Sequence, residues 1–262
     1  MVRILSLRVP SEEHLALVKA KAQDIEPDYD HLRSWTRSYV LGHSKRIALD
    51  VDIVCRYATK DDAILECGSI PPLLTASLKD LGYCVTGVDI DPSRFSQFIQ
   101  SRELNVVRCD LESEIFPFAE GQYDIIIFNE IFEHLRLNII KTMKEVHRIL
   151  KKDGILLLST PNLRSVNGIM NFLFRNKSYS CCPDIYQEYA KLEQIGHMGH
   201  VREYTTREVS EFLAKLDFKV ETLLFRGSEN GQLARITSMF TPRFRPFVTY
   251  VARAQKSEPK ED

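Results

Sequence analysis

The distribution of apolar and polar positions changes near residue 61, where short apolar runs begin to alternate with longer amphipathic segments. Each run has the length of a β-strand, and the segments between the runs repeat their apolar residues with helical period. The runs span 63–67, 83–88, 105–109, 124–129 and 154–159, and the helical segments span 73–81, 92–103 and 138–150. This repetition of strand, helix and strand predicts a doubly wound α/β sheet of mostly parallel strands, a Rossmann-like architecture.

The rest of the chain divides around this repeat. Two later runs, 218–225 and 247–254, follow a helical segment at 206–216 and bring the expected sheet to seven strands. Residues 1–58 show helical patterns at 12–23 and 29–57 without strand-like alternation, which predicts a helical N-terminal extension. We therefore expect an α/β domain over 59–255 that carries an inserted lid segment at 164–204, and a disordered charged tail at 256–262.

Polar side chains follow four of the predicted strands at the point where each strand ends. They are Glu66, Asp89, Asp110 and Asn129. Ligands of open parallel sheets bind beyond the carboxyl ends of the strands, and a carboxylate such as Asp89 can accept hydrogen bonds from both hydroxyls of a ribose. Aspartates at these positions also serve as helix N-caps. Four polar strand ends in succession favour a ligand site over four separate caps.

Composition and charge limit the classes of partner and compartment. The chain has 262 residues, with 35 Lys and Arg against 36 Asp and Glu, so it has no overall attraction for nucleic acid or anionic membranes. Six cysteines are scattered without a C-x-x-C pair, which predicts a reducing, cytoplasmic location. We recognise neither a secretory signal sequence nor an apolar stretch of membrane-spanning length.

Three segments make the chain resemble the class I S-adenosylmethionine-dependent methyltransferases, in particular the type 11 and type 23 groups. These groups have an E-H-L sequence after the fourth strand and a lysine-aspartate-glycine turn before the fifth. The corresponding segments here are FNEIFEHL at 128–135, LKKDGILLLSTPN at 150–162 and GHVREYT at 199–205. The resemblance extends from about residue 61 to residue 254 and leaves the first 58 residues unassigned.

The resemblance implies S-adenosylmethionine as the cofactor and assigns a place to each strand end. Glu66 would bind the methionine amino group, and Gly68, with Ser69 beside it, would approach the methionine carboxylate through the backbone. Asn129 would face the methionine end. In the adenosine half, Asp89 would bind the ribose and Ile90 would lie against the face of the adenine. Asp110 would bind the N6 amine, and the backbone of Leu111 would bind a ring nitrogen.

One loop departs from the pattern of the family. The first loop of the family has three alternating glycines, whereas ECGSIPP at 66–72 keeps only Gly68. Ile70 and Pro72 restrict the backbone where the ligand meets bare main chain in the family. A methyltransferase-like binding or scaffold protein without catalytic activity is therefore an alternative to an enzyme.

Two histidines are candidates for chemistry at the methyl acceptor. His200 lies in the inserted segment, and with an unperturbed pKa near 6.5 it could act as a general base for a hydroxyl acceptor. His134 could face the substrate or pack at the start of a helix. For His200 and its neighbour His197, ordering the loop is the structural alternative, and Arg202 and Tyr204 could either bind substrate or tie the loop down.

We expect no metal site. The sequence E-x-x-E-H formed by Glu130, Glu133 and His134 superficially resembles the zinc motif H-x-x-E-H, but that motif requires histidine at position 130.

The resulting functional hypothesis is methyl transfer to a small-molecule, sugar- or glycan-linked, or lipid-linked acceptor, with a hydroxyl as the expected group. An apolar run at 169–174 with Arg164, Arg175 and Lys177 around it could contact a lipid tail or a membrane surface, or form a lid helix packed on its own core. An RNA methyltransferase is the alternative, based on a basic stretch that contains Arg33, Arg37, Lys45 and Arg46. Nucleic acid is not the expected partner, and the oligomeric state is left open.

Overall fold

The computed structural model describes residues 2–7, 9–182, 184–195, 199–227 and 241–256. The chain forms two compact units. We call Leu7–Pro117 the N-terminal unit, and Met1–Ser6 together with Phe118–Asp262 the C-terminal unit. His197 and residues 257–262 of the expected tail lie outside the described residues.

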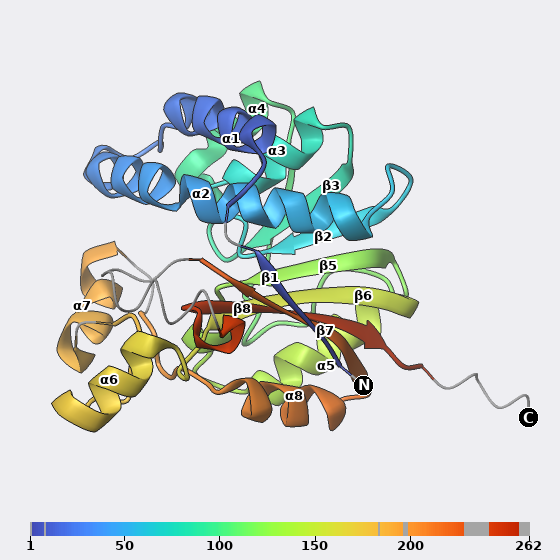
Figure 1. The fold of residues 1–262 in the computed structure, drawn as a ribbon. Helices are drawn as coiled ribbons and strands as arrows, with labels where there is room; N and C mark the ends of the chain where they lie inside the picture. Colours follow the sequence, from blue (N-terminus) through green and yellow to red (C-terminus); the bar gives the residue numbers. More distant parts are fainter. Residues whose placement is uncertain (1, 8, 183, 196–198, 228–240, 257–262) are drawn as a thin grey trace, which may run out of the picture. The chain divides into compact units, whose positions relative to one another are not determined.

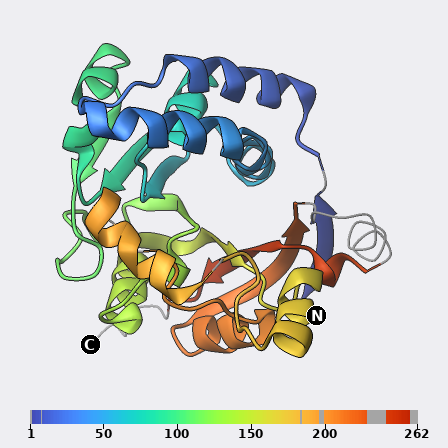
Figure 2. The ribbon, with the colours of Figure 1, turned by 90° about the vertical axis from the view of Figure 1, so that its left-hand side faces the viewer.

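The N-terminal unit contains three parallel strands in the order β2-β3-β4 and the helices that connect and cover them (Figure 1). Its helices α1 and α2 run side by side in both views (Figures 1 and 2). Ser11 caps α1 and also bonds to Asp52 of α2, which fixes one helix against the other. The elements are α1 Glu12–Asp24, η1 Asp30–Leu32, α2 Arg33–Tyr57, β2 Ala63–Cys67, α3 Leu73–Asp80, β3 Cys84–Asp89, η2 Pro92–Phe95, α4 Ser96–Ser101 and β4 Asn105–Arg108.

The C-terminal unit contains five strands in the order β1-β7-β8-β6-β5. β5 and β6 are parallel, whereas β8 runs antiparallel to both β6 and β7. Helix α8 packs its buried residues Val209 and Leu213 toward the core of this unit. The elements are β1 Arg3–Leu7, β5 Tyr123–Asn129, η3 Phe132–His134, α5 Ile139–Ile149, β6 Leu150–Pro161, α6 Val166–Arg175, α7 Ile185–Ile195, α8 Thr206–Ala214, β7 Phe218–Arg226, η4 Pro242–Phe244 and β8 Phe247–Ala254.

The α/β class with mostly parallel strands is confirmed, but two details differ from the expectation. Residues 3–7, expected in a purely helical extension, form strand β1, so the described residues contain eight strands instead of the seven expected. β1 is the outermost strand in its unit and is largely exposed, so it carries little of the apolar alternation by which a buried strand is recognised.

The second difference concerns β6, which starts at Leu150 and includes the lysine-aspartate-glycine turn. The pairing with β5 shifts between Tyr123 and Ile125, so the extra residues are accommodated as an irregularity within the strand. The ammonium group of Lys151 bonds to the carboxylate of Asp124 at this point and ties the irregular stretch to β5.

In the part of the chain that the structure describes, none of the helices is both long enough and apolar enough to cross a membrane.

Candidate functional site

The carboxyl ends of β2, β3 and β4 bring three of the expected site residues to one edge of the N-terminal unit. Glu66 of β2 pairs with Gly87, two residues before Asp89 at the end of β3. Asp89 in turn pairs with Arg108 of β4, which lies two residues before Asp110. The strand register therefore places Glu66, Asp89 and Asp110 along the same edge.

The loop after β2 turns at Gly68, whose φ of 66° lies in the left-handed region that favours glycine. The backbone N–H groups of Gly68 and Ser69 both donate to the carbonyl of Val88, at 2.8 and 3.2 Å. The side chain of Ser69 is fully buried, and its Oγ atom has no hydrogen-bond partner among the described residues.

Gly87 is the residue that makes room for this loop. A Cβ atom at position 87 would lie 2.6 Å from Ser69 Oγ and 2.9 Å from Ser69 Cβ. Gly87 was not among the residues expected from the sequence, although a glycine inside a strand is a recognised sign of close approach by another backbone or a ligand.

Asp89 is oriented by two backbone donors. The N–H of Ile70 donates to Oδ2 at 3.2 Å, and the N–H of Asp91 donates to Oδ1 at 3.1 Å. Burial raises the pKa of Asp89, although both backbone bonds favour the ionised form. Asp91, not Asp89, occupies the N-cap position of η2, so the helix-cap interpretation does not describe Asp89. The next residue, Ile90, is 49% exposed and presents an apolar surface beside the carboxylate.

Asp110 lies in a tight turn after β4. Its carboxylate accepts hydrogen bonds from the N–H of Glu112 at 3.0 Å and from Ser113 Oγ at 2.6 Å. Burial raises the pKa of Asp110, but these bonds outweigh it and the net pKa is lowered. The ionised, half-buried carboxylate is therefore part of a local turn, and Leu111 beside it is also half-buried.

Glu66 is a buried carboxyl group whose Oε2 accepts a hydrogen bond from Thr75 of α3. Burial raises the pKa of Glu66, and the nearby carboxylates of Asp50 and Asp89 also raise it against the opposing effect of Thr75, so that the net pKa is about 8. A bound cation would reverse this preference for the neutral form. Asp50 of α2 and Thr75 belong to this arrangement and were not identified from the sequence.

In the C-terminal unit, Asn129 ends β5, and its Oδ1 atom is buried without a hydrogen-bond partner among the described residues. The next residue, Glu130, has a φ of 55°, which is strained for a residue with a side chain. Its carboxylate accepts bonds from Ser159 of β6 at 2.7 Å and from the fully buried Arg226 of β7 at 3.1 Å. Arg226 was not expected from the sequence because this contact joins residues 96 positions apart.

The two candidate histidines lie together in this unit. The rings of His134 and His200 meet edge to face with 4.8 Å between their centroids. Glu133 is fully buried, and its Oε1 lies 3.8 Å from His200 Nε2 while its Oε2 accepts a bond from Thr160. The backbone carbonyl of Glu133 also accepts from the N–H groups of Val201 and Arg202, which anchors the end of the inserted segment.

The expectation that His200 has an ordinary pKa is wrong. Burial lowers the pKa of the imidazole, but the Cys181 thiol and the carboxylates of Glu203 and Glu133 outweigh burial and raise it to about 11. The ring is therefore protonated at neutral pH, which removes the basis for a general base of ordinary pKa.

Arg202 and Tyr204 have local structural contacts. Arg202 donates to Glu208 of α8 at 2.5 Å and lies over the ring of Tyr204, which packs edge to face on Phe132. Two residues of the basic stretch also have partners within the chain, since Arg33 pairs with Asp30 and Arg46 donates to the hydroxyl of Tyr39.

Comparison with known families identifies the chain. A family model described as a methyltransferase domain matches residues 45–223. The chain belongs to this methyltransferase family. The matched range starts within α2.

Individual relatives are more distant. The ribosomal protein L11 methyltransferase of Thermosipho africanus is 31% identical over 113 residues, which cover 42% of this chain and 42% of that protein. Its counterpart in Thermosipho melanesiensis is 26% identical over 144 residues, covering 52% and 54%. The chain thus matches about half the length of these curated relatives or less.

A crystal structure of an S-adenosylmethionine-dependent methyltransferase from Thermotoga maritima has the same fold, with a TM-score of 0.56, 17% identity and coverage of 86% of this chain and 96% of that one. The family match and this neighbour confirm the expected class I methyltransferase fold and imply S-adenosylmethionine as the cofactor.

Proposed function

We propose that this protein transfers a methyl group from S-adenosylmethionine to a hydroxyl acceptor of small-molecule, glycan-linked or lipid-linked type. The observation that carries the methyltransferase proposal is Asp89, which ends β3 within the matched family domain and is oriented by two backbone donors beside the exposed Ile90. This combination suits a ribose that carries an adenine ring.

The residues present fit the cofactor. The buried Oγ of Ser69, which has no hydrogen-bond partner in the described part of the chain, matches a polar ligand group in the N-terminal unit. Glu66 would gain an ammonium partner in place of its proton, Gly68 would allow close approach at the carboxylate, and Asp89 would bind the ribose hydroxyls. Asp110 and the backbone of Leu111 would bind the adenine edge, while Ile90 would lie against its face.

When bound, S-adenosylmethionine supplies an electrophilic methyl group on its sulfonium. The side chains of this protein would contribute by binding and alignment, which can provide most of the rate enhancement in such a displacement. We assign His134 to the acceptor side, with the ring of His200, which packs edge to face against it, as the group that orients it.

The exposed apolar side chains of α6 and α7 favour an acceptor with an apolar portion over the other proposed acceptors. Phe172, Leu173 and Phe174 of α6 are 65–73% exposed, and Tyr186 of α7 is 82% exposed. No acidic residue occurs between Asp153 and Asp184, whereas basic residues flank the apolar run. An apolar surface with basic neighbours is suited to a lipid tail attached to an anionic head group.

The experiment that tests this proposal measures transfer of radiolabelled methyl groups to cell extracts separated into lipid, glycan, small-molecule, protein and RNA fractions. We expect label in the lipid, glycan or small-molecule fraction. Label in protein would instead agree with the names of the Thermosipho relatives, and label in RNA would support the alternative based on α2. Binding of S-adenosylmethionine without transfer to any fraction would favour a catalytically silent protein.

The matched control is Asp89→Asn, which removes the carboxylate proposed to hold the ribose while keeping the size of the side chain. Incorporation that persists at the wild-type rate in this variant would show that the labelled fraction was not modified through the proposed cofactor site.

A further inference from the structure

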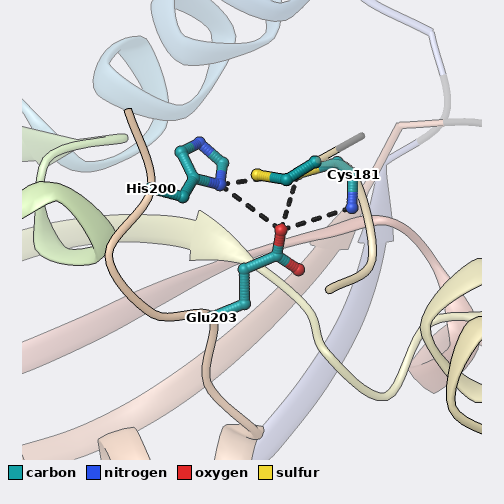
Figure 3. A group of neighbouring side chains, drawn as sticks. Cys181, His200 and Glu203 are labelled. Atoms are coloured by element: carbon teal, nitrogen blue, oxygen red, sulfur yellow. Dashed lines mark hydrogen bonds and ion pairs between the residues drawn. The ribbon is translucent and has the colours of Figure 1, made fainter. Parts of the chain in front are cut away.

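The inserted segment brings two cysteines, a histidine and a glutamate into one cluster outside the proposed cofactor site. Cys181, Cys182, His200 and Glu203 each offer one ligand atom, and these four atoms all lie within 4.8 Å of one another. Figure 3 shows that Cys181 comes from one loop, while His200 and Glu203 come from another. We propose that these four side chains form a binding site for a divalent transition metal ion, with zinc as the best match.

The distances between the side chains suit a single ion. Zinc binds sulfur at about 2.3 Å and nitrogen or oxygen at about 2.0–2.2 Å, so neighbouring ligands in a tetrahedral site are about 3.3–3.6 Å apart. Cys181 Sγ lies 3.2 Å from Glu203 Oε1 and 3.8 Å from His200 Nδ1, and the latter two atoms are 3.3 Å apart (Figure 3). These three atoms therefore surround a space of the required size.

The outer contacts hold the ligands in the orientation that a metal requires. Glu203 uses its Oε2 atom to accept from the backbone N–H of Ser180 at 2.5 Å and from the Ser180 hydroxyl, which leaves Oε1 directed at Cys181 and His200. His200 directs Nε2 toward Glu133, whose Oε1 is buried without a hydrogen-bond partner among the described residues. A carboxylate behind a metal-bound histidine is a recurrent second contact in zinc sites.

The chemistry of the four groups identifies the class of ion. Thiolate and imidazole ligands select zinc and related transition metals over magnesium or calcium, and four protein ligands without an open position are typical of a structural site. The thiols and the imidazolium would release their protons to solvent when the ion binds. In the metal-free arrangement, Glu203 Oε1 faces the Cys181 thiol, the Cys181 N–H and His200 Nδ1, and the ion would take the place of the shared protons.

The consequence would be a cross-link within the inserted segment. The ion would join the loop that follows α6 to the segment that leads into α8, since Cys181 and Cys182 belong to the first and His200 and Glu203 to the second. This role is independent of the identity of the methyl acceptor.

A second, overlapping group consists of Glu133, His134 and His200. It offers three ligands without sulfur and includes the fully buried Glu133. The two groups can be distinguished because only the four-residue cluster would give thiolate-to-metal charge transfer.

The test uses the full chain purified under reducing conditions without chelator. We expect about one zinc per chain by mass spectrometry of the metal content, and cobalt substitution should give near-ultraviolet thiolate-to-cobalt absorption with the visible bands of a tetrahedral site. Cys181→Ser and Cys182→Ser should each weaken cobalt binding by at least about 10-fold. Cys84→Ser, at an exposed cysteine of the N-terminal unit, is the matched control and should bind like the wild type.

Three results would overturn the proposal: wild-type protein that takes up neither metal, cobalt binding without thiolate absorption, or equal loss of binding in Cys84→Ser and Cys181→Ser. Circular dichroism of each variant separates loss of the site from loss of the fold. If Cys181→Ser failed to fold, Glu133→Gln would serve as the second variant. Cobalt bound by Glu133→Gln at reduced affinity, with thiolate absorption, would still support the four-residue cluster. Cobalt spectra of Glu133→Gln without thiolate absorption would reject it.

Discussion

At the scale of single residues, the carboxyl groups at the strand ends differ because their surroundings differ. Asp110 is kept ionised by bonds from its own turn, whereas Glu66 is buried near two other carboxylates and favours its neutral form. Asp89 lies between these extremes, with burial opposed by two backbone donors. The three side chains could therefore recognise different parts of one ligand, even though all were found by the same sequence criterion.

The first prediction concerns Asp89. Asp89→Ala should weaken S-adenosylmethionine binding by at least about tenfold, since a hydrogen bond to a charged group contributes about 1.5–3 kcal/mol. Calorimetric titration measures the change, and Asp62→Ala, at a carboxylate of the same unit that bonds to Thr59, is the control. Equal affinity in the wild type and Asp89→Ala would remove Asp89 from the site.

The second prediction uses the raised pKa of Glu66. The unfolded carboxyl titrates near 4.5 and the folded one near 8, so the folded state binds more protons between these values. The contribution of Glu66 to the free energy of unfolding is therefore fully present below pH 4.5 and is lost as the pH rises through about 8. Its slope can reach about 1.4 kcal/mol per pH unit.

Urea unfolding of cofactor-free protein between pH 5 and 9 tests this prediction by comparing the wild type with Glu66→Gln. The difference between the two curves isolates Glu66 from the other titrating groups. Parallel curves over the whole range would show that Glu66 is ionised in the folded protein.

At the scale of elements, the first loop, between β2 and α3, lacks two of the three glycines of the family. It packs closely against the neighbouring strand β3 because a glycine of β3 leaves room for it. Gly68 makes the turn, Gly87 of β3 receives Ser69, and the N–H of Ile70 serves as a donor to Asp89. The donor at position 70 is a backbone group, so the departure to Ile70 leaves its contact with the proposed ribose ligand in place, and the glycine-poor loop is compatible with the site.

The third prediction follows from this packing. Gly87→Ala places a methyl group 2.6 Å from Ser69 Oγ, so we expect a loss of about 1–3 kcal/mol in the free energy of unfolding, as for other overpacked positions. The double variant with Ser69→Gly should recover part of the loss because both crowded Ser69 atoms are then absent. Denaturant unfolding measures both effects, and an unchanged midpoint in Gly87→Ala would contradict the packing.

At the scale of the molecule, each unit places polar groups at the carboxyl ends of its strands, but the C-terminal unit does so through a buried ion pair. Arg226 of β7 reaches Glu130 after β5 and Ser159 of β6, at 3.1 and 2.6 Å, and so links three strands. Only 1% of the Arg226 side chain and 12% of the Glu130 side chain are exposed. This contact fixes the carboxylate of Glu130, the residue with strained backbone that follows Asn129.

The fourth prediction tests this link. Arg226→Met should lower the free energy of unfolding by about 3–5 kcal/mol because it leaves the carboxylate of Glu130 without its buried partner. Arg253→Met, which breaks the more exposed pair between Arg253 of β8 and Glu221 of β7, should cost at most about 1 kcal/mol. Similar losses in the two variants would show that Glu130 does not depend on Arg226.

The sequence by itself predicted the strands and helices of the α/β repeat and the candidate cofactor residues, because both predictions depend on local information. Apolar periodicity marks each buried strand and amphipathic helix, and in a parallel sheet the residue that ends a strand lies at the ligand edge whatever the rest of the chain does. Glu66, Asp89, Asp110 and Asn129 were proposed as cofactor residues in this way. The exposed strand β1 could not be predicted from the sequence, since it has too little buried surface to produce the apolar pattern of a buried strand.

Only the tertiary structure decided which distant side chains meet and how they are charged. Arg226 reaches Glu130 across 96 positions, and Cys181 approaches His200 and Glu203 from 19 and 22 positions away through loops without a regular period. The pKa of His200 depends on these neighbours and on burial, so its ordinary value was the wrong expectation. Such properties arise from packing in three dimensions, where short distances are unrelated to spacing along the chain.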